Sequence, residues 1–273
     1  MHRPPPQALL IDLDGVMFQG DRPLAGAGRL LERLVGRPHC FVTNNPIRTP
    51  PEIADACVAM GLPRPDPRFI LTSALATARW LGHQRSDLRY FAVGAGGLEA
   101  ALSAVGRRDE RNANTVVIGE GVGLDFETLT TGINLILERG ARLVATNPDT
   151  TVDGMRNGRP VVLPGCGALV APFAAATGVT PTIIGKPEPL LFEMALAQLG
   201  AVPADCLMIG DRPDTDIAGA ERLGMWTALV RTGRFAPGRD WVAGLPRPDL
   251  DVDDLGRLMD ALDRTFPGLL ATS

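Results

Sequence analysis

The chain of 273 residues is poor in the side chains that usually form zinc sites and disulfides. It has four cysteines and three histidines. The cysteines are widely spaced, form no C-x-x-C pair and lie mostly within apolar runs. This pattern predicts buried, reduced thiols and argues against a disulfide framework or a zinc site.

Long apolar runs are also lacking. No segment reaches the roughly 18 uninterrupted apolar residues of a membrane span. The run near the N-terminus, which ends at Asp12, is too short for a signal peptide. The sequence therefore predicts a cytoplasmic protein with no membrane partner.

The charge has no basic excess, with 27 basic against 31 acidic residues and a net charge of −4. Without a cluster of Lys or Arg, nothing attracts the chain to nucleic acid, and none is expected as a partner. The apolar fraction of 45% is that of a folded globular protein with a sizeable core.

Short β-type runs alternate with helical patterns almost throughout, which predicts an α/β fold with a doubly wound, Rossmann-like parallel sheet. The expected strands are 8–11, 39–42, 90–93, 115–118, 142–145, 182–184, 207–209 and 227–230. The expected helices are 28–34, 52–60, 98–105, 126–139, 190–199 and 217–223.

Polar residues cluster where four of these strands end, after residues 11, 42, 184 and 209. The carboxyl ends of parallel strands share one edge of a sheet, so we expect these polar groups around one pocket. The middle of the chain contributes none of them, which suggests an inserted domain. We expect a catalytic core of residues 1–79 and 183–273, and an inserted α/β cap domain of residues 80–182.

Two of these strand ends carry carboxylates. Asp12-Leu13-Asp14-Gly15 follows the first strand, and a loop with Asp211, Asp214 and Asp216 follows the strand 207–209. Clustered negative charge at strand ends is costly without a cation, and carboxylate oxygens suit Mg²⁺. Asp211 lies nearest the strand end and is the best ligand. Asp216 either supports a metal site or acts as a helix cap. Asp12 and Asp14 could likewise belong to a simple turn in which an aspartate caps the next helix.

The other two strand ends suit an anion. Thr43-Asn44-Asn45 offers a hydroxyl, amides and the free N–H groups of a helix start. The same residues could serve only as an N-cap before Pro46. Lys186 lies between turn-forming residues. A lysine is usually a solvated surface group, but Lys186 is the single lysine of the chain, which makes a point-charge role more plausible. Together the four loops predict Mg²⁺-assisted phosphoryl transfer by a carboxylate nucleophile.

With these motifs in order, the sequence resembles the haloacid dehalogenase-like phosphatases over nearly its whole length. The resemblance is to the type IIA subclass, the nitrophenyl-phosphatase and phosphoglycolate-phosphatase-like proteins. It rests on residues 12–16, 41–45, 185–189 and 210–217, with 145–149 and 163–169 in the cap region.

The resemblance implies a role for each matched residue. Asp12 would attack phosphorus and form an aspartyl phosphate, and Asp14 would act as general acid and base. Mg²⁺ would be held by Asp12, the Asp14 carbonyl and Asp211, with Asp216 in support. Three further residues, Thr43, Asn44 and Lys186, would bind the phosphoryl group. The expected substrate is a small phosphorylated metabolite, and relatives suggest a homodimer through the cap.

Three other functions stay open at this point. A phosphosugar mutase would use the same aspartyl chemistry, and a regulatory protein could keep the fold without activity. A nicotinamide-dependent oxidoreductase is suggested only by an incomplete G-x-G-x-x-G pattern at residues 94–99. In the cap region, Asn147, Asp149, Arg156 and Arg159 are either residues that face the leaving group or a solvated loop.

Overall fold

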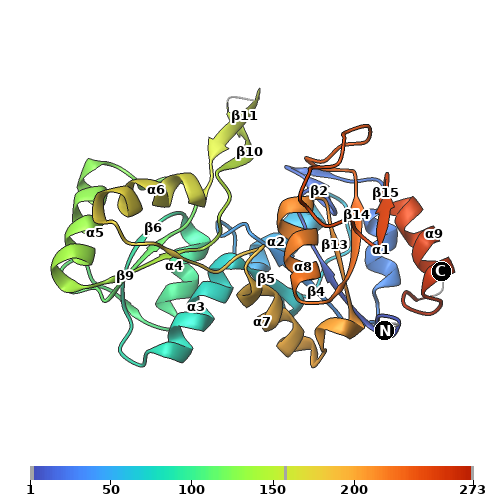
Figure 1. The fold of residues 1–273 in the computed structure, drawn as a ribbon, viewed down its shortest axis with the longest axis horizontal. Coiled ribbons are helices and arrows are strands. Elements are labelled where there is room, and N and C mark those ends of the chain that lie inside the picture. Colours follow the sequence, from blue (N-terminus) through green and yellow to red (C-terminus); the bar gives the residue numbers. More distant parts are fainter. Residues whose placement is uncertain (1–2, 157–158, 272–273) are drawn as a thin grey trace. The chain divides into compact units, whose positions relative to one another are not determined.

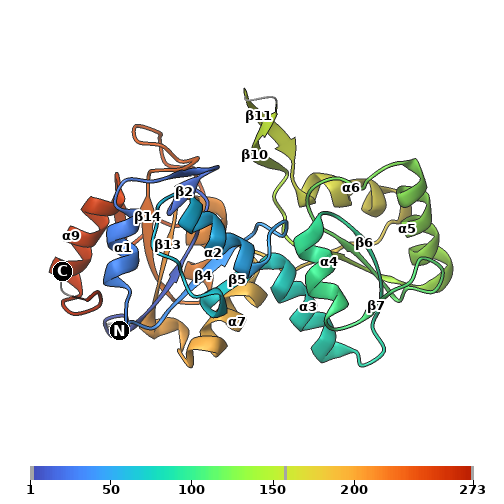
Figure 2. The ribbon, with the colours of Figure 1, turned by 180° about the vertical axis from the view of Figure 1, so that it is seen from behind.

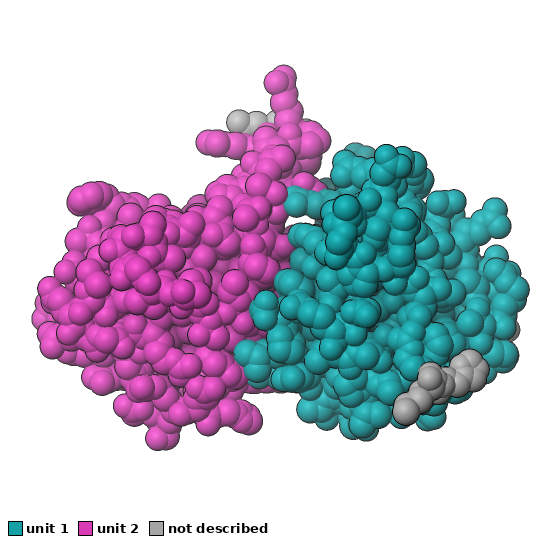
Figure 3. Space-filling model, in the orientation of Figure 1, with its two compact units in different colours: residues 1–43, 50–71, 186–273 teal, residues 44–49, 72–185 magenta. Residues whose placement is uncertain are grey.

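The computed structural model describes residues 3–156 and 159–271 and divides into two compact units, coloured separately in Figure 3. Unit 1 comprises Met1–Thr43, Pro50–Leu71 and Lys186–Ser273. Unit 2 comprises Asn44–Thr49 and Thr72–Gly185. Unit 2 is thus inserted into unit 1 along the sequence, and each unit is described by itself below.

The division differs in detail from the boundaries expected at residues 79/80 and 182/183. Helix α3 (Ser73–Gln84) runs without a break across 79/80 and packs on α4 (Gly96–Ser103) of unit 2. The short strand β12 (Thr182–Ile183) pairs with β9 (Arg142–Ala145) of the same unit. The division therefore falls just outside these two elements, where few contacts cross.

Unit 1 is built on a six-stranded sheet in the order β15 (Leu250–Val252), β14 (Trp226–Val230), β13, β1, β4 and β5 (Ile70–Thr72). Its central strand β1 (Ala8–Ile11) pairs in parallel with β13 (Cys206–Gly210) on one side and with β4 (His39–Thr43) on the other. The order of the strands reverses at β1, which makes the carboxyl end of this strand a topological switch point.

Both faces of this sheet are covered, as near-continuous apolar strands require. Alternate strand residues such as Leu9, Ile11 and Phe41 belong to a core cluster with α1 (Ala27–Arg33), α2 (Pro50–Ala59) and α9 (Leu255–Thr265). Helix α7 (Pro189–Leu199) packs on β4 and on α8 (Ala218–Arg222), and α8 packs on β14. Figures 1 and 2 show α7 beside the sheet from two sides.

Unit 2 has a five-stranded sheet in the order β12, β9, β8 (Thr115–Ile118), β6 (Arg89–Val93) and β7 (Arg107–Arg108), and all of these strand pairs are parallel. Helices α5 (Phe126–Arg139) and α6 (Cys166–Thr177) share a buried apolar cluster with this sheet. Figure 1 shows α3 and α4 on its other side, and a hairpin of β10 (Thr151–Arg156) and β11 (Arg159–Pro164).

Every strand and helix expected from the sequence is present with small shifts at the ends. The structure also has elements that the sequence did not predict. Besides α3, α6, α9, β5, β7, β10, β11 and β15, these are the short elements β2 (Phe18–Gln19), β3 (Arg22–Pro23), η1 (Pro67–Phe69), η2 (Pro203–Asp205) and η3 (Pro213–Ile217). Within the described ranges, no helix combines the length and apolarity of a membrane span.

Candidate active site

Asp12 continues the central strand of unit 1 at its carboxyl end. The strand residues before it are fully buried, and the backbone N–H of Asp12 donates to the carbonyl of Ile209 at 2.9 Å. The apolar strand fixes the backbone, so the Asp12 carboxylate is held at the switch point with little exposure to solvent.

Lys186 brings two distant carboxylates together. Its Nζ lies 2.8 Å from Oδ1 of Asp12 and 2.7 Å from Oδ1 of Asp216, and it donates to the carbonyl of Val42 at 3.2 Å. The lysine side chain is only 2% exposed. A buried ammonium with this set of acceptors is a fixed positive charge beside Asp12.

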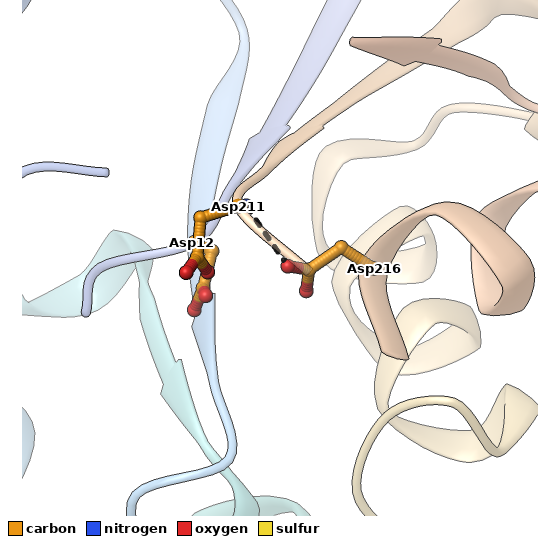
Figure 4. Close-up of side chains that lie close together, drawn as sticks. All are labelled: Asp12, Asp211 and Asp216. Carbon is orange, nitrogen blue, oxygen red and sulfur yellow. Dashed lines mark hydrogen bonds between the residues drawn. The ribbon is translucent and has the colours of Figure 1, made fainter. Parts of the chain in front are cut away.

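Asp211 and Asp216 complete the cluster from the loop after β13. Oxygen atoms of Asp12, Asp211 and Asp216 all lie within 4.8 Å of one another, and Figure 4 shows the side chains of Asp12 and Asp211 side by side. Oδ2 of Asp216 accepts the backbone N–H groups of Asp211 at 3.2 Å and of Arg212 at 3.0 Å. Asp216 therefore shapes the loop that presents Asp211.

The cluster carries more negative than positive charge. Burial raises the pKa of Asp12 well above its usual range, against the lowering effect of Lys186. Burial, with the nearby Asp216 carboxylate, raises the pKa of Asp211 to about 7. Burial lowers the pKa of Lys186, but the carboxylates of Asp12 and Asp216 outweigh it and raise the pKa above its ordinary value.

These features suit a divalent metal ion. Three ionised carboxylates against one ammonium leave two negative charges uncompensated, which matches the charge of such an ion. Oδ1 of Asp211 is buried and has no hydrogen-bond partner among the described residues. Oxygen-only donors are those that Mg²⁺ prefers. A bound cation would lower the pKa values of Asp12 and Asp211 and hold both side chains ionised.

Glycines that the sequence analysis did not single out make room for Asp211. A Cβ on Gly233 would lie 1.9 Å from Oδ2 of Asp211, and one on Gly15 would lie 2.5 Å from the same atom. The backbone N–H of Arg234 donates to this oxygen at 2.9 Å, and the Thr232 hydroxyl donates to the Gly15 carbonyl at 2.6 Å. In the sequence, the only sign of this contact was the pair Thr232-Gly233 just after the expected strand 227–230.

The other expected site residues are placed differently. Thr43 ends β4 and is buried in unit 1. Asp14 is exposed and forms a backbone bridge with Phe18. Asn44 belongs to unit 2, where its amide Nδ2 donates to Oδ2 of Asp149 at 2.9 Å. The structure thus groups Asp12, Lys186, Asp211 and Asp216 directly.

The glycine-rich turn at residues 94–97 begins α4, but its packing differs from that of a dinucleotide site. The N–H of Gly97 donates to the Ile47 carbonyl at 2.7 Å. A Cβ on Gly97 would lie 2.6 Å from the carbonyl oxygens of Pro46 and Ile47. This glycine therefore lets a neighbouring loop of unit 2 approach the helix, and the helix start is not open to a pyrophosphate.

Comparison with known proteins agrees with this geometry. Residues 9–108 match the family described as haloacid dehalogenase-like hydrolase, and residues 183–258 match a HAD-hydrolase-like family. The chain is 36% identical over 228 residues to an acid sugar phosphatase of Staphylococcus haemolyticus, covering 82% of this chain and 84% of the relative. This chain belongs to the haloacid dehalogenase-like hydrolases.

Solved structures of this family share the fold. A p-nitrophenyl phosphatase from Archaeoglobus fulgidus has a TM-score of 0.85 and 28% identity, covering 95% of this chain and all of that one. A thermostable NPPase double mutant from Geobacillus stearothermophilus has a TM-score of 0.80 and 33% identity, covering 93% and 97%. The predicted α/β fold, the type IIA subclass and the phosphatase class are confirmed, and the oxidoreductase alternative is not supported.

Proposed function

We propose that this phosphatase hydrolyses small phosphate monoesters, sugar phosphates among them, with Mg²⁺ and through an aspartyl phosphate on Asp12. The observation that carries the proposal is the 2.8 Å contact between Asp12 and the buried Lys186 at the end of β1. Relatives named acid sugar phosphatase and p-nitrophenyl phosphatase support the ester class. In this proposal unit 2 is the cap that selects the leaving group.

The reaction has two displacements at phosphorus. An oxygen of Asp12 forms a bond to phosphorus while the ester P–O bond breaks, and Asp14 gives a proton to the leaving alkoxide. Water then attacks the aspartyl phosphate while Asp14 takes up its proton, and the bond between phosphorus and Asp12 breaks. Free phosphate and an alcohol are the products.

Charge neutralisation accounts for the remaining residues. The ammonium of Lys186 offsets negative charge between nucleophile and phosphoryl group, with Thr43 and Asn44 as hydrogen-bond donors to phosphoryl oxygens. Asp12, the Asp14 carbonyl and Asp211 would hold Mg²⁺, which supplies charge stabilisation and alignment. Asp216 keeps both Lys186 and the Asp211 loop in place through the contacts described above.

An ester panel tests this proposal. p-Nitrophenyl phosphate and a series of sugar phosphates, nucleoside monophosphates and phosphoglycolate are incubated with the protein, with Mg²⁺ or with a chelator. We expect release of inorganic phosphate that needs Mg²⁺. A sugar phosphate converted into its isomer without phosphate release would instead identify a mutase, and turnover unaffected by the chelator would contradict the metal.

A further inference from the structure

The segment 44–49 directly follows strand β4 of unit 1 but belongs to unit 2. The Ile47 carbonyl of this segment accepts the N–H of Gly97 in the first turn of α4. The segment lies so close that a side chain at position 97 would have no room. The hydroxyl of Ser73, at the start of α3, donates to the Asn44 carbonyl at 2.6 Å. Asn44 is therefore held by unit 2, although Thr43 directly before it belongs to unit 1.

Asn147 is a second anchor for Asn44. Its side chain is fully buried, and Nδ2 donates to the Asn44 carbonyl at 2.7 Å and to Oε1 of Glu120 at 2.8 Å. Its Oδ1 accepts the backbone N–H of Asp149 at 3.0 Å. An amide offers two N–H donors and one carbonyl oxygen, so these contacts occupy both donors and engage the oxygen. Asn147 has no donor left for a leaving group.

Asp149 fixes the side chain of Asn44. Its carboxylate is 6% exposed and accepts from Nδ2 of Asn44 at 2.9 Å. A carboxylate oxygen accepts and an amide Nδ2 donates, so this contact sets which end of the Asn44 amide points toward Asp149. Asn44 is thus oriented through its main chain and its side chain by the same loop, residues 146–149.

The same loop also anchors the residue before Lys186. The backbone N–H of Gly185 donates to the Thr146 carbonyl at 2.8 Å. A Cβ on Gly185 would lie 2.7 Å from that carbonyl oxygen and 2.5 Å from Oδ1 of Asn44. Two points where the chain passes between the units, 43/44 and 185/186, are therefore held by one buried loop, and each adjoins a residue of the candidate site.

We propose that Asn147 and Asp149 are positioning residues of the phosphatase reaction, acting through Asn44 and Gly185 on the phosphoryl-binding groups. The inference rests on the function proposed above. Its physical basis is that a phosphoryl-binding amide must be aligned before the reaction, because a misalignment of about 1 Å far from the chemistry can cost about 100-fold in rate. A loop that only stabilises unit 2 would change the amount of folded enzyme but not its affinity for phosphate.

A double-mutant cycle with Asn44→Ala and Asp149→Ala separates these roles. We measure kcat and KM for p-nitrophenyl phosphate and the inhibition constant of inorganic phosphate. Each single variant should raise KM and the inhibition constant about tenfold, the effect of one hydrogen bond to a charged group. The double variant should be no worse than Asn44→Ala, because Asp149 acts through Asn44.

Matched variants complete the design. Asp109→Ala removes a carboxylate of the same unit that accepts the backbone N–H groups of Arg111 and Asn112 and pairs with Arg107. It should leave both constants within twofold. Asp149→Asn keeps an oxygen acceptor and should restore most of the affinity for phosphate. Asn147→Ala should raise the same constants as Asp149→Ala.

The inference is overturned if Asp149→Ala leaves the inhibition constant unchanged, or if the two single effects multiply in the double variant. Either result leaves the proposed function intact, provided that the wild type releases phosphate. If the wild type releases none, the proposed function fails, and the affinity for inorganic phosphate, measured by isothermal titration, still decides the positioning role. Asp149→Ala should then weaken phosphate binding about tenfold, whereas unchanged binding would refute the inference.

Discussion

Nζ of Lys186 lies between Oδ1 of Asp12, at 2.8 Å, and Oδ1 of Asp216, at 2.7 Å. The single lysine of the chain thus joins the end of the central strand to the loop after β13. All three side chains are almost completely buried. Such a cluster is expensive to desolvate, and it is retained where its charges serve chemistry rather than stability.

Replacing Asp12 by Asn should abolish turnover. The substitution keeps the size of the side chain but removes the nucleophilic carboxylate, so we expect a fall in kcat of about 10³-fold or more. The control is Asp214→Asn, which removes a half-exposed carboxylate paired with Arg212 in the same unit. Activity of the Asp12 variant within tenfold of the wild type would exclude Asp12 as nucleophile.

Asp211→Asn should weaken Mg²⁺ binding. Its buried Oδ1 has no hydrogen-bond partner in the described structure and is free to coordinate a cation. Isothermal titration of the protein with MgCl₂ measures the effect without substrate. We expect a dissociation constant at least about tenfold higher. Equal affinities of this variant and Asp214→Asn would refute the assignment of Asp211 as a ligand.

Gly233→Ala should disturb the other oxygen of Asp211, Oδ2, from the loop after β14. The new methyl group would lie 1.9 Å from Oδ2 of Asp211, so either the loop or the carboxylate has to move. We expect weaker Mg²⁺ binding in the same titration. Gly96→Ala is the matched control, because nothing lies within 4 Å of the added Cβ. A normal Mg²⁺ affinity of Gly233→Ala would show that the loop yields without disturbing Asp211.

Lys186→Met should lower both stability and turnover. Without the ammonium, Asp12 and Asp216 are left as buried, unpaired carboxylates, and breaking such a pair costs about 3–5 kcal/mol. Chemical denaturation with a chelator present measures the free energy of unfolding. Adding Asp12→Asn to the variant should recover part of the loss, since one unpaired charge disappears. Strictly additive losses would show that the two groups are not coupled.

Local patterning was enough to predict much of the fold. Apolar runs such as residues 8–11 bury whole strands, and the alternation with helices favours a parallel sheet, so the α/β class and the main elements followed. The acidic and basic strand ends predicted that Asp12, Lys186 and Asp211 lie close together, as they do in the structure. Helix α3 was not predicted, because its small residues give a weak periodicity. The expected boundary at 79/80 therefore fell inside this helix, whereas the structure divides the units at 71/72.

The sequence by itself determined the residue types and their order along the chain, because strand ends and turns follow from local propensities and apolar spacing. Only the tertiary structure decided that Lys186 pairs with both Asp12 and Asp216, and that Gly233 leaves room for Asp211. It also decided that Asn44 is held by Asn147 and Asp149. These relationships join residues far apart in the chain, and such contacts depend on how sheets and loops pack rather than on any local pattern.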